Sequence, residues 1–349
     1  MAIGAWADHF GVRLLRAPDF RRFWSAQVVS ELGSGVTALA LPLTAVLWLD
    51  ASAIEMGVLR AAATLPVLLL ALLAGVWVDR LPRRPILIGA DAGRGLLLVL
   101  VPLAAAAGAL RIELLWAVAF AVGALTVLFD IAVTSYVPTL VERSALVQAN
   151  ATLQASASAA RIAGPGVAGW LVQLLGAPFA IALDAASFLA SAALLGRVRA
   201  PEEQRAGPRA GLRAEIAEGI AAVWNDPILR AMVLTTTIGS LAGAVQGAIY
   251  VLYATRELGT TPAALGAVLA CGSAAGLAGA ALAGPAAARL GAGGALAAGS
   301  ATIAASSLVL LIAPAGARGA YVLAAAQVLF GVGMTTFSVT QISLRQAMT

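Results

Sequence analysis

The sequence predicts an all-α polytopic membrane protein, and its composition, its long apolar segments and its short polar loops predict it. Of the 349 residues, 61% are hydrophobic and only 11% are charged, whereas a soluble globular domain carries roughly 25% charged residues. A span needs about 20 mostly apolar residues. Ten segments meet that requirement: 23–49, 54–78, 86–109, 113–137, 147–174, 177–196, 228–254, 262–285, 293–314 and 319–343. This composition excludes soluble enzymes.

The ten segments divide six against four. Residues 1–22 are charged and amphipathic, so they predict an N-terminal segment outside the bilayer and no cleavable signal peptide. Residues 23–196 hold six spans joined by short loops, a six-helix bundle. Residues 197–227 form a polar linker rich in Arg and Glu, and within it 212–224 predicts an amphipathic helix on the membrane surface. Residues 228–349 hold the remaining four spans.

Arginine predicts the orientation of these spans. All 22 basic residues are Arg, and with the N-terminus inside, sixteen of them fall in cytoplasmic segments against three in outer loops. Positive residues accumulate on the cytoplasmic side. We therefore expect a multi-pass protein of the cytoplasmic membrane with a cytoplasmic N-terminus, and the Ala-, Gly- and Arg-rich composition suggests a bacterial source. The arginines lie in short loops without a long basic face, so a nucleic-acid partner is not expected.

The chain repeats itself at an offset of 209 residues. PDFR at 18–21 aligns with PILR at 227–230, and Ala-Gly at 74–75 aligns with Ala-Gly at 283–284, with no gap over about 65 residues. A parallel six-helix repeat around a basic loop is typical of two-halved secondary transporters. Two such units predict about 418 residues and twelve helices, so the ten spans lack the last two. We expect either a truncated record or a truncated protein.

Three sequence signatures resemble the major facilitator superfamily. GVWVDRLPRR at 75–84 resembles the family's G-x-x-x-D-R-x-G-R-R loop, with Pro82 in place of a glycine. The resemblance implies a gating loop of Gly75, Asp79, Arg80, Arg83 and Arg84, in which Asp79 pairs with helix 11. Helix 11 would lie beyond the ten spans counted in these 349 residues.

The second signature is GPGVAG at 164–169, which resembles the G-P-x-x-G-G element of the family's antiporter branch. The resemblance implies a kink and close packing at Gly164, Pro165 and Gly169, and a generic small-residue kink is the alternative. GLRAEIAEG at 211–219 and LDAASFLASA at 183–192 resemble the enterobactin-exporter-like and macrolide-efflux-like branch. ADAGR at 90–94 fits it as well. The resemblance implies the major facilitator fold and drug efflux by proton antiport.

Ionisable side chains within the spans are the candidate site residues, because each costs roughly 2.5–3.5 kcal/mol at the bilayer centre. Glu31 and Asp130 are candidates for proton coupling, since burial penalises a charged carboxylate. The alternatives are that Glu31 pairs with Arg161, and that Asp130 pairs with loop arginines. Position 240, the repeat of Glu31, is Ser, and Thr336 is the repeat of Asp130.

Three further charges complete the candidate set. Arg161 lies near the middle of its span and either lines a substrate cavity or neutralises a buried carboxylate. Asp184 is assigned to the substrate cavity, with a general packing or hydrogen-bonding role as the alternative. Asp91 and Arg94 are three residues apart on one span, so we expect a mutual ion pair beside the gating loop.

We therefore interpret the sequence as an exporter of a small amphipathic molecule, such as a drug or siderophore, working by proton antiport as a monomer in the lipid bilayer. Uptake or uncoupled transport, and a non-transporting remnant, are the alternatives. With a single histidine, His9, and a single cysteine, Cys271, we expect no His/Cys metal site. We expect no cofactor and no catalytic residues.

Overall fold

The computed structural model describes residues 14–200, 224–225 and 227–348, and within these ranges all regular structure is helical. The all-α prediction is thus confirmed. The chain forms two compact units, Met1–Ala206 and Gly207–Thr349. Each is described below by itself.

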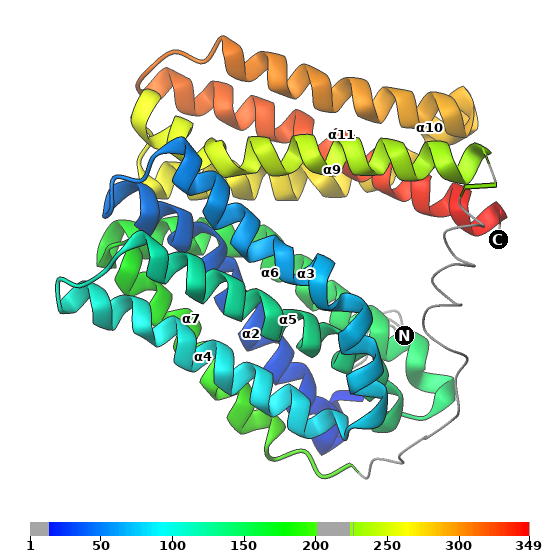
Figure 1. The fold of residues 1–349 in the computed structure, drawn as a ribbon. Coiled ribbons are helices and arrows are strands. Elements are labelled where there is room, and N and C mark those ends of the chain that lie inside the picture. The colour runs from blue at the N-terminus through cyan, green and yellow to red at the C-terminus, as the bar shows by residue number, and fades with distance from the viewer. Residues whose placement is uncertain (1–13, 201–223, 226, 349) are drawn as a thin grey trace, which may run out of the picture. The chain divides into compact units, whose positions relative to one another are not determined.

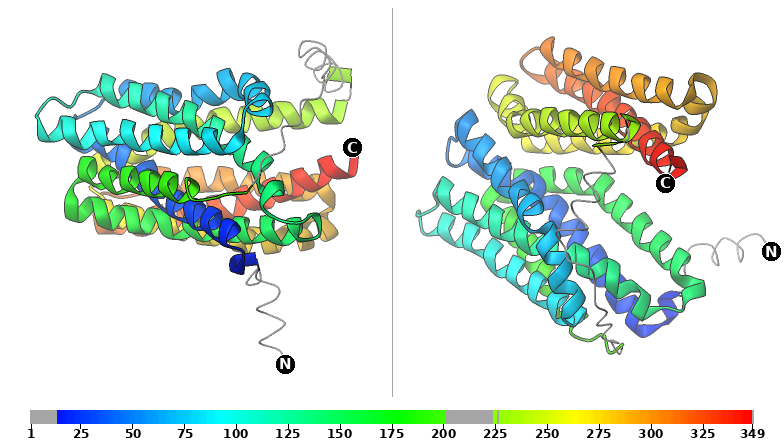
Figure 2. Two further views of the ribbon diagram at one scale, coloured as in Figure 1. Left: turned by 90° about the horizontal axis from the view of Figure 1, so that it is seen from below. Right: turned by 45° about the vertical axis from the view of Figure 1, so that its right-hand side comes forward.

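The first unit contains six long helices (Figure 1). They are α2 (Pro18–Leu47), α3 (Ala53–Arg80), α4 (Arg83–Ala106), α5 (Ile112–Leu140), α6 (Leu146–Leu175) and α7 (Ala177–Leu195), with short 3-10 turns at Leu14–Arg16 and Arg143–Ala145. Helix α7 packs against α2 and α4, while α5 packs against α3 and α4, and α6 against α2. The two views of Figure 2 show the same bundle from other sides.

Local sequence explains where several of these helices begin. Pro18 occupies the first turn of α2, where its missing N–H costs nothing. Ser52 precedes α3 and forms a reciprocal capping box with Glu55: Glu55 N–H donates to Ser52 Oγ (3.3 Å), and Ser52 N–H donates to Glu55 Oε2 (2.7 Å). Gly176, at φ 85°, joins α6 to α7 in a left-handed conformation that suits glycine.

Aromatic side chains fill the core near one end of this unit. Phe20 and Phe23 of α2 are fully buried, and the Phe23 ring lies 5.7 Å from that of Tyr136 on α5. Val78 of α3 and Leu87 of α4 belong to the same buried cluster. This core fixes the helix ends that carry the charged loop at 75–84.

The second unit contains α9 (Pro227–Leu252), a π-helical turn at Tyr253–Glu257, α10 (Pro262–Leu311) and α11 (Ala317–Met348). Helix α10 is interrupted at Gly291, which has φ 73° and ψ 167°. In Figures 1 and 2 its two halves run back alongside each other. Helix α11 touches both: Gly272 lies against Gln327, and Gly299 lies against the backbone of Gly333.

The predicted count of ten spanning helices is not confirmed. The described residues form nine long helices, because α10 contains two of the predicted spans. Eight helices satisfy the length and hydropathy of a span, and α6 is not among them. Trp224, at the end of the predicted amphipathic helix, is exposed. The rest of that stretch lies outside the described residues.

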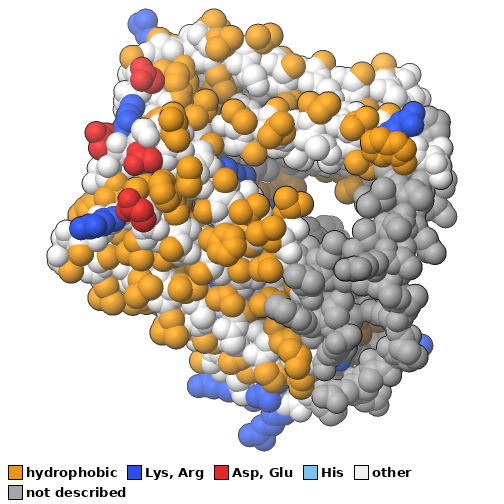
Figure 3. Space-filling view, viewed as in Figure 1, with side chains coloured by type: hydrophobic (Ala, Val, Ile, Leu, Met, Phe, Trp, Pro, Cys, Tyr) orange, Lys and Arg blue, Asp and Glu red, His pale blue; other side chains and the backbone are white. Residues whose placement is uncertain are grey.

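Apolar side chains dominate the face of the molecule seen in Figure 3, and most of its charged side chains lie near helix ends. Many large apolar residues are exposed, including Leu68 at 79% and Leu308 at 65%. Monomeric soluble proteins rarely expose such continuous apolar surface. The protein is therefore a multi-pass membrane protein.

Candidate functional site

The first unit holds a buried charge cluster between α4, α5 and α7. Arg94 forms an ion pair with Asp91 one turn earlier on α4, and Asp91 also accepts a hydrogen bond from Ser191 Oγ of α7 (2.5 Å). Asp91 is 0% exposed and Arg94 3%. We call Asp91, Arg94 and Ser191 the Arg94 cluster.

Aromatic rings enclose the guanidinium of this cluster. The Cζ atom of Arg94 lies 4.3 Å from the centre of the Phe129 ring and 4.2 Å from that of Phe188. A cation between two ring faces gains electrostatic attraction from each. Arg94 also donates to Thr126 Oγ1 of α5 at 3.4 Å. Three helices thus meet at one buried cation.

Glu31 and Asp130, the predicted proton-coupling residues, lie on different helices of the same unit. Glu31 is half-buried on α2 and Asp130 is exposed on α5. The two carboxyl groups interact electrostatically, and Asp130 also interacts with Arg94. Two acids near each other can share or exchange a proton more readily than either can hold a negative charge alone.

Arg161 is exposed on α6, where its Nη2 donates to Ser158 Oγ at 3.0 Å. Within the described residues, neither Glu31 nor Asp130 forms an ion pair with Arg161. Arg161 therefore presents its charge away from the buried core.

Asp184 is 1% exposed and lies where α7 crosses α2. Its Oδ1 accepts a hydrogen bond from Ser187 Oγ at 3.0 Å. Gly33 of α2 makes room for it, because a Cβ added there would lie 2.4 Å from Asp184 Oδ1 and 1.9 Å from Ser187 Oγ. The carboxyl group is buried between two helices.

Gly164 and Pro165 lie inside α6, which stays helical from Leu146 to Leu175. A Cβ added at Gly164 would lie 3.2 Å from the Cα atom of Gly35 on α2. The two glycines therefore bring the α2 and α6 backbones into direct contact. Gly169 is buried one turn further along α6.

The predicted gating loop joins α3 to α4 through Leu81 and Pro82. The side chains of Asp79 and Arg80 lie outside the described set. Arg84 reaches the end of α7, where its Nε donates to Leu195 O (3.3 Å) and its Nη2 to Gly196 O (2.5 Å). Leu195 O also accepts from the Val198 N–H (3.1 Å), and carbonyls at the C-terminal end of a helix attract a cation. Arg83 also makes an interaction of its own.

Sequence reasoning missed Arg22 as a second cation at this helix end. Arg22 Nη1 donates to the carbonyl of Arg197 at 2.9 Å and pairs with Asp19 at 3.0 Å. It also missed Ser191 and Phe188. The signal was present, because Asp184, Phe188 and Ser191 are spaced four and three apart, on one face of a helix.

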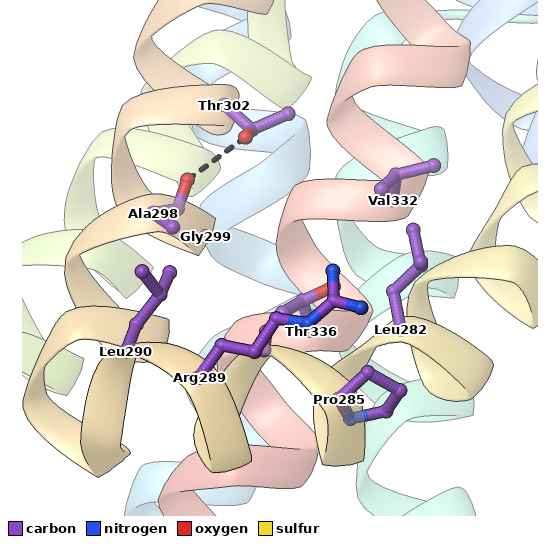
Figure 4. A pocket seen from close by; sticks show the side chains of 10 residues that line it. Leu282, Pro285, Arg289, Leu290, Ala298, Gly299, Thr302, Val332 and Thr336 are labelled. Carbon is purple, nitrogen blue, oxygen red and sulfur yellow. Dashed lines mark hydrogen bonds between the residues drawn. The ribbon is translucent and has the colours of Figure 1, made fainter.

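The second unit has a pocket of about 420 Å³ between the two halves of α10 and α11. Its walls are mostly apolar, including Leu282, Pro285 and Val332, and Figure 4 shows Arg289 extending across it beside Thr336. Thr336 Oγ1 donates to Gly279 O at 3.0 Å, so its hydroxyl is satisfied within the unit. Arg289 and Thr336 are the repeat positions of Arg80 and Asp130.

Comparisons with known proteins agree with this architecture. The chain is similar to the multidrug efflux pump Tap of Mycolicibacterium fortuitum, with 29% identity over 268 residues that cover 73% of this chain and 64% of that protein. It is 30% identical to the Tap pump of Mycobacterium tuberculosis H37Rv over 253 residues, 69% of this chain and 59% of the relative. The chain thus spans less than two thirds of the length of these relatives.

Solved structures share the fold. The nucleoside transporter NupG matches 92% of this chain and 80% of its own, with a TM-score of 0.74 and 10% identity. A bacterial homologue of the iron transporter ferroportin in an inward-facing state matches 96% and 85%, with a TM-score of 0.67 and 17% identity. The sequence model of the Major Facilitator Superfamily matches residues 23–349. The chain therefore belongs to the major facilitator superfamily.

Proposed function

We propose that the protein exports a small amphipathic molecule from the cell by proton antiport. The observation that carries this proposal is the interacting pair Glu31 and Asp130, two acids on neighbouring apolar helices. Identity of 29–30% to multidrug efflux pumps supports the direction of transport and a drug-like or siderophore-like substrate.

The pair supplies a proton-binding group that a substrate can discharge. Two nearby carboxylates favour binding a proton, because like charges repel in a medium of low dielectric. Entry of a substrate, above all a cationic one, stabilises both as carboxylates and releases the proton. Return to the outward-facing state reloads the pair, so each cycle exchanges a proton for a substrate molecule.

Alternating access, the mechanism of secondary transporters built from two repeated halves, supplies the movement in this proposal. Arg161 and Asp184 belong to the substrate-facing half in this proposal, Arg161 from an exposed position and Asp184 by fixing the α2–α7 contact. The loop at 75–84 latches the inward-closed state, with Arg84 tying α4 to α7. The contact between Gly164 and Gly35 lets α6 and α2 move as one body.

The proposal includes a topology. The N-terminus and the linker 197–227 are cytoplasmic, as the arginine distribution favours. Residues 23–196 and 228–349 are the two bundles, and the break at Gly291 divides α10 into two crossings, which gives ten in all. The protein works as a monomer in the cytoplasmic membrane of a bacterium.

Transport in vesicles tests the assignment. We would reconstitute the full-length protein, impose a pH gradient, and follow ethidium, an amphipathic fluorescent cation. The double variant Glu31→Gln/Asp130→Asn is expected to lose pH-driven flux. Glu113→Gln removes an exposed carboxylate in the first turn of α5 and is expected to leave flux unchanged.

Two results would contradict the proposal. Undiminished pH-driven flux in the double variant would remove the acid pair from coupling. Wild-type flux that ignores a collapsed gradient would replace antiport with the uncoupled mechanism.

A further inference from the structure

Asp184 has a buried oxygen without a partner. Ser187 Oγ donates to Oδ1, but Oδ2 makes no hydrogen bond within the described residues. The Oγ1 atom of Thr37 on α2 is also buried, and its hydroxyl lies close enough to Asp184 to interact with the carboxyl group, although it forms no hydrogen bond of full geometry there. A buried acceptor without a donor is costly, and an ionised one far more so.

The surrounding charges do not favour an ionised Asp184. Arg94 of α4 is the cation that interacts with it, and Arg94 is already paired with Asp91. Asp91 itself adds a second negative charge to the same surroundings. On α2, Glu31 interacts with Asp130 instead, and on α6, Arg161 donates to Ser158. The single positive charge of Arg94 is thus shared by two buried carboxyl groups, those of Asp91 and Asp184.

We propose that Asp184 is a proton-binding site, separate from Glu31 and Asp130, whose carboxyl group is neutral while α2 and α7 are in contact. The proton-binding site itself is inferred from the structure, and only its role in transport rests on the proposed function. With a proton bound, Oδ2 becomes an O–H donor, and Thr37 Oγ1 provides the neighbouring acceptor. The two unpartnered oxygens then satisfy each other.

The geometry links this proton to movement of the helices. Asp184 is 1% exposed, and Gly33 lets α2 lie directly against its carboxyl group. Water cannot reach Oδ2 while this contact persists, so the proton leaves only when α2 and α7 part. The site therefore holds its proton in one arrangement of the bundle and exchanges it in another.

Infrared difference spectroscopy tests the inference directly, because it resolves the C=O stretch of a protonated carboxyl group. The purified full-length protein at mildly acidic pH is expected to show such a band, and Asp184→Asn is expected to lose it. The band should persist in Glu113→Gln and in Glu31→Gln/Asp130→Asn. Thr37→Val keeps the side-chain shape, removes the acceptor, and should shift the band to higher frequency.

A band unaltered by Asp184→Asn, or unshifted by Thr37→Val, would overturn the inference. If Asp184→Asn does not fold, the Thr37→Val shift decides it alone. The flux assay and the infrared assay can fail separately. If the flux assay contradicts proton antiport, the Asp184 band is still expected. If the band is absent, pH-driven flux that depends on Glu31 and Asp130 is still expected.

Discussion

The Arg94 cluster permits a prediction with an internal control, because the first unit contains the same ion pair twice. Asp19–Arg22 on α2 and Asp91–Arg94 on α4 both join an Asp to an Arg three residues later. Their side chains are 31% and 37% exposed in the first pair, and 0% and 4% in the second. The two ion pairs have the same residues and spacing, and they differ strongly in burial.

We expect Asp91→Asn to destabilise the protein by about 3 kcal/mol. Removal of one partner from a buried pair costs roughly 3–5 kcal/mol, since the other charge stays buried. The lower end applies because Asn keeps an oxygen that accepts from Arg94, and because Asp130 also attracts Arg94. Asp19→Asn should cost below ~1 kcal/mol, as exposed pairs do.

Reversible unfolding in mixed micelles, followed by tryptophan fluorescence, measures both variants. A second substitution, Arg94→Gln, removes the stranded charge, so Asp91→Asn/Arg94→Gln should recover about 2 kcal/mol relative to the sum of the single changes. Equal stability of Asp91→Asn and Asp19→Asn would refute the reasoning. Another carboxylate, Asp130 or Asp184, would then neutralise Arg94.

Three further variants test the packing and the helix ends. Gly35→Ala places a Cβ 3.0 Å from the α6 backbone and should cost about 1–3 kcal/mol in the same unfolding assay, whereas Gly57→Ala meets open space in α3 and should stabilise by up to about 1 kcal/mol. Arg84→Gln loses a charged donor from the end of α7 and should cost about 1–2 kcal/mol, less in high salt. Gly291→Ala forces alanine into the left-handed region at φ 73° and should cost about 1–2 kcal/mol, measured by thermal unfolding. Gly293→Ala, which has open space around it, should cause no such loss of stability. Equal effects of the two substitutions would contradict the strained turn at Gly291.

The helices could be predicted because runs of about 20 apolar residues are a local signal. The structure shows that the helix ends are also set locally, since Pro18, the capping box at Ser52 and the left-handed Gly176 each act within one turn of a helix end. The Asp91–Arg94 pair is equally local, and the expected pair is present. The count of ten spans is not confirmed, because the two spans predicted at 262–285 and 293–314 lie within the one helix α10, which is interrupted between them at Gly291.

Contacts between helices could not be predicted in the same way. A helix that is apolar on every side carries little periodic signal to show which face meets protein and which meets lipid. Ser191 meets Asp91 across 100 residues of sequence, and Gly33 meets Asp184 across a larger separation. Arg161 shows the same limit: its charge suggested a partner in Glu31, and the structure places it against Ser158 of its own helix.

The two repeats differ in their acidic residues, and the candidate proton-coupling residues of our proposal all lie in the first unit. The repeat positions of Glu31, Asp79 and Asp130 are Ser240, Ala288 and Thr336, and Glu257 is the only acid between residues 227 and 349. Thr336 donates to a backbone carbonyl of α10, so a neutral, satisfied hydroxyl stands where the first repeat has an acid. Loss of a carboxylate removes both a proton-binding group and the cost of burying its charge. In the proposed antiport, the candidate proton-binding groups among the described residues therefore lie on α2, α5 and α7 of the first unit, while the second unit offers a pocket of apolar side chains, hydroxyls and Arg289.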